Sequence, residues 1–218
     1  MGPMILGVIP ARGGSKGVPR KNLKTICGRP LIAWTIDAAK RARRLDRWVV
    51  STEDAEITAI ARREGAEVLN RPRELATDEA STLAVIQHAL TEIPTDVVVV
   101  LHPTSPIRRD DLIDAAITRF EQSGADSLGT VHKDFSYEYG QDMPRRQEIR
   151  PRLIDNGNVY VLDARLVRAG RWLGERLATY EVSREEGVEI DDEFDWWLAE
   201  RILGERRPAA TPREGAYA

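Results

Sequence analysis

The run "DVVVVL" at residues 96–101 constrains the fold more than any other feature of the chain. Consecutive valines favour an extended strand, because β-branched side chains pack well on a pleated surface. A strand that is apolar at every position, and not only at alternate positions, is typical of a central parallel strand buried on both faces. This run therefore predicts a sheet that is covered by helices on both sides.

Strand and helix patterns alternate around this run. Apolar runs typical of strands lie at 4–9, 47–52, 66–69, 125–131, 156–163 and 178–182. Helical patterns lie at 29–43, 54–65, 81–93, 109–124 and 191–203. The alternation predicts an α/β fold with a Rossmann-like, mostly parallel sheet and helices on both faces. Ligands bind to such sheets beyond the carboxyl ends of the strands.

Two segments depart from this alternation. Residues 132–152 are polar and charged without a clear period, so we expect them to leave the sheet as an excursion. The pair Asn156-Gly157 is expected to form a turn at the start of the next strand. Residues 205–218 are rich in proline, glycine and charge, which predicts a disordered tail after a single domain at 1–204.

The composition excludes several classes of function. The formal net charge of −3 gives no general attraction to nucleic acid or to an anionic membrane. No apolar run approaches the roughly 20 residues that cross a bilayer, and the first residues lack a basic leader. Cys27 is the only cysteine, so we expect a small packed residue and no intrachain disulfide. We expect a cytoplasmic protein with no nucleic-acid or membrane partner.

The glycine-rich loop "IPARGGSKGVPRKN" (9–22) follows the first predicted strand. It lacks the spacing of a Walker A loop, and Ser15 replaces the second glycine of a dinucleotide fingerprint. Glycines that admit an anion to the backbone and cations that attract it are Gly13, Gly14, Gly17, Arg12, Lys16, Arg20 and Lys21. A solvated basic loop is the alternative, and the position after a strand favours a polyphosphate site. The segment "STED" (51–54) also follows a strand, where helix capping accounts for Thr52 and Asp54.

The loop resembles the signature loop of the sugar-acid cytidylyltransferases, which include acylneuraminate cytidylyltransferases and their legionaminate and pseudaminate relatives. The resemblance recurs in the family's order at "RPRELATDEAST" (71–82), "LHPTSPIR" (101–108), "NGNVY" (156–160) and "EIDDEFDW" (189–196). These segments span most of the chain, to about residue 200. The resemblance therefore implies a nucleotidyltransferase domain over residues 1–204.

The resemblance also implies a reaction, a cofactor and partners. CMP would pass from CTP to the anomeric hydroxyl of a sialic-acid-like (nonulosonic) sugar acid with release of pyrophosphate, and Mg²⁺ would be the cofactor. The excursion at 132–152 corresponds to the family's dimerisation element, so a homodimer is expected. The implied catalytic residues are Arg12, Lys16, Lys21 and Asp191. The implied nucleotide-binding residues are Ala11, Arg12, Gly13, Gly14, Lys16 and Asn22, with Arg71, Ala76, Asp78 and Ser81 on the base and ribose side.

Carboxylates near the end of the chain are candidates for the Mg²⁺ site. On an extended segment Glu189 and Asp191 point to the same side, because side chains alternate with a period of two. Mg²⁺ prefers a few carboxylates and several waters. The family pattern has Asp-x-Asp here, so Glu189 is a departure and Asp191 is the main candidate ligand. The acids that follow are interpreted as charges at a helix N-terminus, namely Asp192, Glu193 and Asp195.

The sugar side of the site is assigned to two segments. The residues predicted to bind the sugar acid are His102, Thr104, Ser105, Arg108 and Asn156, with Arg108 among the donors for its carboxylate. The family usually has Gln at the position of His102 and a small apolar residue at that of Asn158. Because of these departures, another nucleotide or an acceptor such as a sugar phosphate or phosphonate acid stays an alternative. A catalytically silent nucleotide-binding module is the alternative from a different class, and His102 as a structural loop residue is also left open.

Overall fold

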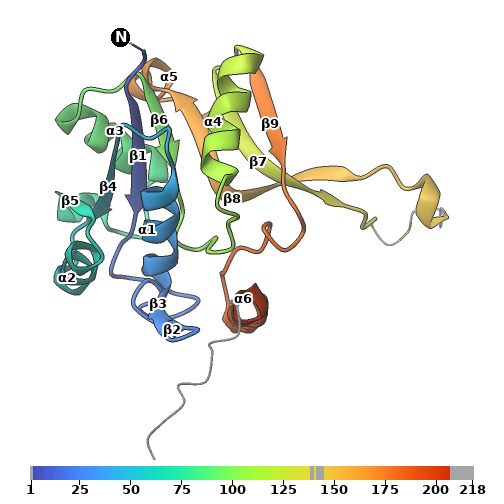
Figure 1. The fold of residues 1–218 in the computed structure, drawn as a ribbon, viewed down its shortest axis with the longest axis horizontal. Helices are drawn as coiled ribbons and strands as arrows, with labels where there is room; N and C mark the ends of the chain where they lie inside the picture. Colours follow the sequence, from blue (N-terminus) through green and yellow to red (C-terminus); the bar gives the residue numbers. More distant parts are fainter. Residues whose placement is uncertain (1, 138–139, 141–144, 207–218) are drawn as a thin grey trace, which may run out of the picture.

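A seven-stranded sheet forms the centre of the protein, whose computed structural model describes residues 2–137, 140 and 145–206 (Figure 1). The strand order is β5-β4-β1-β6-β8-β7-β9. The bounds are β1 Ile5–Pro10, β4 Arg47–Thr52, β5 Glu67–Asn70, β6 Val97–Val100, β7 Ser127–Asp134, β8 Arg152–Asp163 and β9 Leu177–Glu181. The strands therefore lie close to the segments that the sequence predicts.

The sheet is mostly parallel, as predicted. β6 pairs in parallel with β1 and antiparallel with β8, and β7 is antiparallel to β8 but parallel to β9. Within β6, Val98, Val99 and Val100 are fully buried, which confirms a central strand covered on both faces. One of its two neighbours, however, runs in the opposite direction.

Helices cover both faces of the sheet. Ile5 and Ile9 of β1 belong to the core formed with α1 (Leu31–Arg41), α2 (Ala55–Arg63) and α4 (Leu112–Ser123). Leu6 and Val8, on the other face of the same strand, belong to the core formed with α3 (Thr82–Glu92) and α5 (Ala164–Arg168). This division follows from the alternation of side chains along a strand. No helix within the described residues has both the length and the apolar character needed to cross a membrane.

A third apolar cluster lies apart from the sheet. The short strands β2 (Thr25–Ile26) and β3 (Arg29–Pro30) form a hairpin, and α6 (Glu193–Arg206) packs near it through Trp196, Ala199 and Leu203. Cys27 packs against this cluster, in agreement with its predicted packing role. Because α6 continues to Arg206, the helix includes two residues that the sequence assigned to the tail. Residues 207–218, the rest of that predicted tail, lie outside the described residues.

The excursion begins as a continuation of the sheet. Val131–Asp134 of β7 pair with residues 152–155 of β8, and the ribbon that they form extends away from the helices (Figure 1). The described part also contains the short helix η2 (Arg146–Glu148), while 138–139 and 141–144 lie outside the described residues. The predicted turn at Asn156-Gly157 is wrong. The pair lies inside β8, where the ladder with β7 is irregular and Gly157 has a φ of 64°.

Candidate active site

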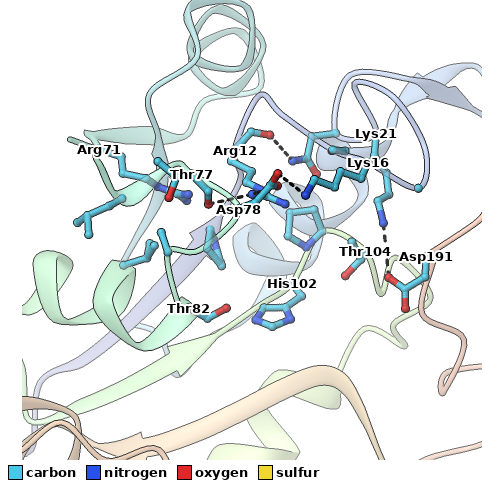
Figure 2. A pocket seen from close by; sticks show the side chains of 18 residues that line it. Arg12, Lys16, Lys21, Arg71, Thr77, Asp78, Thr82, His102, Thr104 and Asp191 are labelled. Carbon is cyan, nitrogen blue, oxygen red and sulfur yellow. Dashed lines mark hydrogen bonds and ion pairs between the residues drawn. The ribbon is translucent and has the colours of Figure 1, made fainter. Parts of the chain in front are cut away.

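An open pocket of about 390 Å³ lies at the carboxyl ends of β1 and β6 (Figure 2). Segments that are far apart in sequence form its walls: the glycine-rich loop after β1, the segment after β5, the loop after β6 and Asp191 before α6. The predicted site residues that line it are Arg12, Lys16, Lys21, Asn22, Arg71, Asp78, His102, Thr104 and Asp191. The pocket thus brings together residues from all three predicted parts of the site.

Arg12 and Lys16 converge on Asp78 (Figure 2). Arg12 Nη1 lies 2.8 Å from Oδ1 of Asp78, and Lys16 Nζ lies 2.7 Å from Oδ2. Arg12 also donates a 2.9 Å hydrogen bond to the carbonyl of Thr77. The hydrogen bond from Lys16 is the main cause that lowers the pKa of Asp78, so this carboxyl stays ionised at neutral pH.

The glycines of the loop serve close packing as well as access to the backbone. The amide of Gly13 donates a 2.7 Å hydrogen bond to Oε1 of Glu53, so this amide is already engaged. A Cβ on Gly17 would lie 2.0 Å from the carbonyl oxygen of Asp191, whereas one on Gly14 would meet nothing within 4 Å. Ala11 is fully buried. The close approach at Gly17 therefore links the loop to the segment of Asp191.

Lys21 connects the same two segments by charge. Its side chain is largely buried and donates a hydrogen bond to the carbonyl of Ile190. Its Nζ lies 3.7 Å from Oδ1 of Asp191, whose side chain is 80% exposed. Asn22 completes the loop by donating a 3.0 Å hydrogen bond to the carbonyl of Arg12. Two predicted site residues, Lys21 and Asn22, are thus held by backbone carbonyls around the pocket.

Glu189 lies beside the pocket wall, where Thr104 Oγ1 donates a 3.1 Å hydrogen bond to its Oε1. Ile190 between the two acids is fully buried, and its amide donates to the carbonyl of Thr104 at 2.8 Å. Burial, and after it the charges of Asp191 and Asp155, raise the pKa of Glu189. Among the described residues, no group of three or more His, Cys, Asp or Glu side chains has the arrangement of a metal site.

Arg71 is a buried residue that lines one side of the pocket, at the left in Figure 2. It donates to the carbonyl of Ser51 at 2.6 Å and to its Oγ at 3.3 Å. Burial lowers the pKa of Arg71 to about 10, so the guanidinium is still charged at neutral pH. Ser81 caps α3 by accepting a 3.2 Å hydrogen bond from the Ala84 amide, and Ala76 ends the short helix η1 (Arg73–Leu75). Neither residue lines the pocket.

His102 faces the pocket from the loop after β6 (Figure 2). Its Nε2 is buried and has no hydrogen-bond partner within the described residues. Burial, aided by the charge of Arg108, lowers the pKa of His102 to about 4. The imidazole is therefore neutral at neutral pH and offers one unused polar atom.

Thr104 lines the pocket, whereas the other predicted sugar contacts, Ser105, Arg108 and Asn156, lie behind the loop and not on the pocket wall. Arg108 is buried and donates to Thr35 Oγ1, the His102 carbonyl and the Asn158 carbonyl, each at 2.8 Å. Ser105 is also buried and donates to the carbonyl of Asn156 at 3.1 Å. Asn156 accepts a 2.7 Å hydrogen bond from Thr130. This buried network holds the loop, and Arg108 does not present its guanidinium to the pocket.

Comparison with known proteins identifies the family. Residues 6–148 match the family model described as cytidylyltransferase. The chain belongs to the cytidylyltransferase family. It is 33% identical to N-acylneuraminate cytidylyltransferase A of Danio rerio over 91% of this chain and 51% of that protein. It is 31% identical to CMP-N,N'-diacetyllegionaminic acid synthase of Legionella pneumophila over 91% of this chain and 96% of that protein.

The chain therefore spans about half the length of the N-acylneuraminate relatives and nearly all of the legionaminic acid relative. A solved structure of CMP:2-keto-3-deoxy-manno-octonic acid synthetase, complexed with CTP, superposes with a TM-score of 0.74. The two chains are 17% identical, and the match covers 93% of this chain and 99% of the other. At this identity the likeness shows that this family member shares that fold.

Several residues that line the pocket of this family member were not assigned to the site from the sequence. Ser15, Thr77, Thr82 and Val85 line the pocket, and Glu53 holds the amide of Gly13. Thr77 and Thr82 lie within the segment 71–82 that carries the family resemblance, so their position was the available signal. Glu53 follows a strand end. Its neighbour Asp54 caps the next helix, and this capping role accounted for the segment without assigning a role to Glu53. Only the approach of the two loops reveals the contact.

Proposed function

We propose that this protein transfers CMP from CTP to the anomeric hydroxyl of a nonulosonic sugar acid. In this reaction the hydroxyl oxygen forms a bond to the α-phosphorus and gives up its proton to a base. The bond from that phosphorus to the bridging α,β-oxygen breaks, and pyrophosphate leaves with the electron pair. The observation that carries the proposal is the convergence of Arg12, Lys16 and Lys21 on one pocket with His102 and Asp191.

The cations suit the charge that develops in such a transfer. Lys16 and Arg12 stand at the glycine-rich loop, where a triphosphate can take both as charge-assisted donors. Negative charge grows on the departing pyrophosphate, so cations held nearby stabilise the transition state more than the bound substrate. Lys21 is fixed by the Ile190 carbonyl and brings its charge toward Asp191. We therefore assign the triphosphate to the side of the pocket near the loop, and these contacts support that assignment.

We assign Mg²⁺ to Asp191, with Glu189 beside it. Two observations support the fit: burial, and after it the like charges of Asp191 and Asp155, raise the pKa of Glu189, and Asp191 is open to the pocket. A divalent cation would relieve this repulsion, and Mg²⁺ commonly binds one or two carboxylates together with substrate phosphates and waters. When bound, the ion would neutralise charge on the phosphates. Thr104 Oγ1 donates a hydrogen bond to the Glu189 carboxylate and so helps to fix its orientation.

Of the two departures from the family pattern, His102 bears on the identity of the acceptor more than Asn158 does. Asn158 is buried and donates to the carbonyls of Ile107 and Glu186, so this departure from the family pattern lies outside the pocket. His102 presents its neutral ring to the pocket and is the departure that bears on another nucleotide or acceptor. The names of the relatives favour a nonulosonic acid as acceptor.

The homodimer is also a proposal. A sugar carboxylate needs a cation, and Arg108 is engaged inside the fold. The ribbon formed by β7 and β8 leaves the sheet. Leu153 on this ribbon, and Phe135 and Tyr137 just after β7, are exposed, which suits contact with a second subunit. A partner could then supply a cation to the site. The cytoplasmic location stays a prediction from the sequence.

The test is a panel of the four nucleoside triphosphates against several sugar acids, with Mg²⁺ present and pyrophosphate release as the readout. We expect release with CTP and a nonulosonic acid together, and loss of release in Lys16→Ala and Asp191→Ala. Preference for GTP or UTP would reject the cytidine assignment. Unchanged release in both variants would reject the assigned residues. Tight CTP binding without turnover across the panel would favour the silent nucleotide-binding module.

A further inference from the structure

The carboxylate of Asp78 bridges two cations of the glycine-rich loop, Arg12 and Lys16. One oxygen faces Arg12 Nη1 at 2.8 Å and the other faces Lys16 Nζ at 2.7 Å. The adjoining carbonyl of Thr77 accepts a second bond from the same Arg12 nitrogen. Each oxygen of the carboxylate thus has its own cation, which is the arrangement that two oxygens of a phosphate would adopt.

Asp78 lies in the pocket and is not part of the fold's framework. It stands between η1 and α3, its side chain is 39% exposed, and Arg12 and Lys16 are the partners of its carboxylate within the described residues. Lys16 is 79% exposed, so Asp78 is also what holds this long side chain over the loop. An anion that enters the loop must either displace this carboxylate or bind beside its negative charge.

We propose that Asp78 is an internal counter-anion that occupies the phosphate site of the nucleotide-free protein and is displaced by the triphosphate. This inference rests on the proposed function, because it takes the loop to be the triphosphate site. It differs from the contact implied by the family resemblance, in which Asp78 belongs to the base and ribose side. Displacement explains how two like-charged side chains stay together near the surface before the substrate arrives. It also makes anion binding weaker than the two cations alone would allow.

Binding of an anion without a ribose separates these roles. Inorganic tripolyphosphate and CTP are titrated by calorimetry, at constant ionic strength, into the wild type, Asp78→Asn and Asp78→Ala. Glu193→Gln is the matched control, because Glu193 also pairs with a lysine, Lys24 at 2.9 Å, but does not line the pocket. Loss of two exposed ion pairs should tighten tripolyphosphate binding roughly 2- to 30-fold in both Asp78 variants. The control should bind as the wild type does.

The possible outcomes are distinct. Unchanged or weaker tripolyphosphate binding in both Asp78 variants would overturn the inference. Weaker CTP binding with unchanged tripolyphosphate binding would also overturn it, and would support a contact between Asp78 and the ribose. If the wild type itself does not bind tripolyphosphate, the phosphate site of the proposed function fails, and the inference fails with it. A thermal unfolding midpoint close to that of the wild type would show that each variant is folded.

Discussion

Nζ of Lys21 lies 3.7 Å from Oδ1 of Asp191, which joins the loop after the first strand to the segment before the last helix. The same two segments also touch through their backbones, because the space beside Gly17 is filled by the carbonyl oxygen of Asp191. One acid of the pocket is therefore positioned by both charge and steric fit. A substitution in either of these two segments should therefore alter the position of the other segment.

Gly17→Ala tests the steric half of this contact. A methyl group at this position would lie 2.0 Å from the Asp191 carbonyl, so the backbone must move. We expect a loss of about 1–3 kcal/mol in the free energy of unfolding and weaker pyrophosphate release. Gly14→Ala is the matched control, because its methyl group meets nothing within 4 Å. Urea denaturation of both variants gives the comparison, and equal stability would contradict the close approach.

Asp191→Asn tests the proposed Mg²⁺ ligand against its neighbour. We expect the variant to need more Mg²⁺ for half-maximal activity and to lose roughly 100-fold in turnover, as for loss of one transition-state contact. Asp192→Asn removes the same charge one residue away. Asp192 accepts hydrogen bonds from the amides of Phe194 and Asp195, a capping role that Asn can keep. Similar Mg²⁺ dependence in the two variants would argue against Asp191 as the ligand.

His102 should make stability depend on pH. Its pKa is about 4 in the folded protein and near 6.5 when unfolded, so between these values the unfolded chain binds more protons. Stability is therefore lost as the pH falls from about 6.5 to 4. Between pH 7 and pH 5 the wild type should lose about 2 kcal/mol more free energy of unfolding than His102→Gln. Parallel losses in the two proteins, measured with urea, would show that this imidazole is not buried.

Arg108→Lys distinguishes a structural role from sugar binding. Lysine keeps the charge but cannot reach the three acceptors that the guanidinium serves, so we expect a loss of about 2–4 kcal/mol in the free energy of unfolding. Arg41→Lys is the control, since Arg41 pairs with the exposed Asp110, and should change stability by less than about 0.5 kcal/mol. Unchanged stability with a raised KM for the sugar acid would instead support the predicted contact between Arg108 and the sugar carboxylate.

Local patterns along the chain were enough to predict most of the fold. The second strand has the predicted bounds, 47–52, and α3 (Thr82–Glu92) lies within the predicted helical segment 81–93. These features depend on neighbours a few residues apart. The direction of β8 and the place of Asn156-Gly157 inside that strand depend on its partner β7, and no local pattern carries that information.

The residues of the site also divide into those that could be placed from the sequence and those that could not. The cationic loop and the segment containing Asp191 could be recognised because their residue types and order match a known family, and both line the pocket. Arg108 could not be placed, because its three acceptors come from distant parts of the chain and bury a residue type that is usually exposed. Asp78 was assigned to the nucleotide, but only its contacts with Arg12 and Lys16 reveal which side of the pocket it occupies.

The sequence by itself determined the layered α/β architecture, the family and the set of charged residues at the strand ends, because these follow from periodicity and residue type. The tertiary structure decided which of those residues face the pocket, which make all their hydrogen bonds inside the fold, and which pair with one another. Burial and pairing arise only when loops distant in sequence meet. Hence the neutral His102, the engaged Arg108 and the bridging Asp78 are properties of the folded chain.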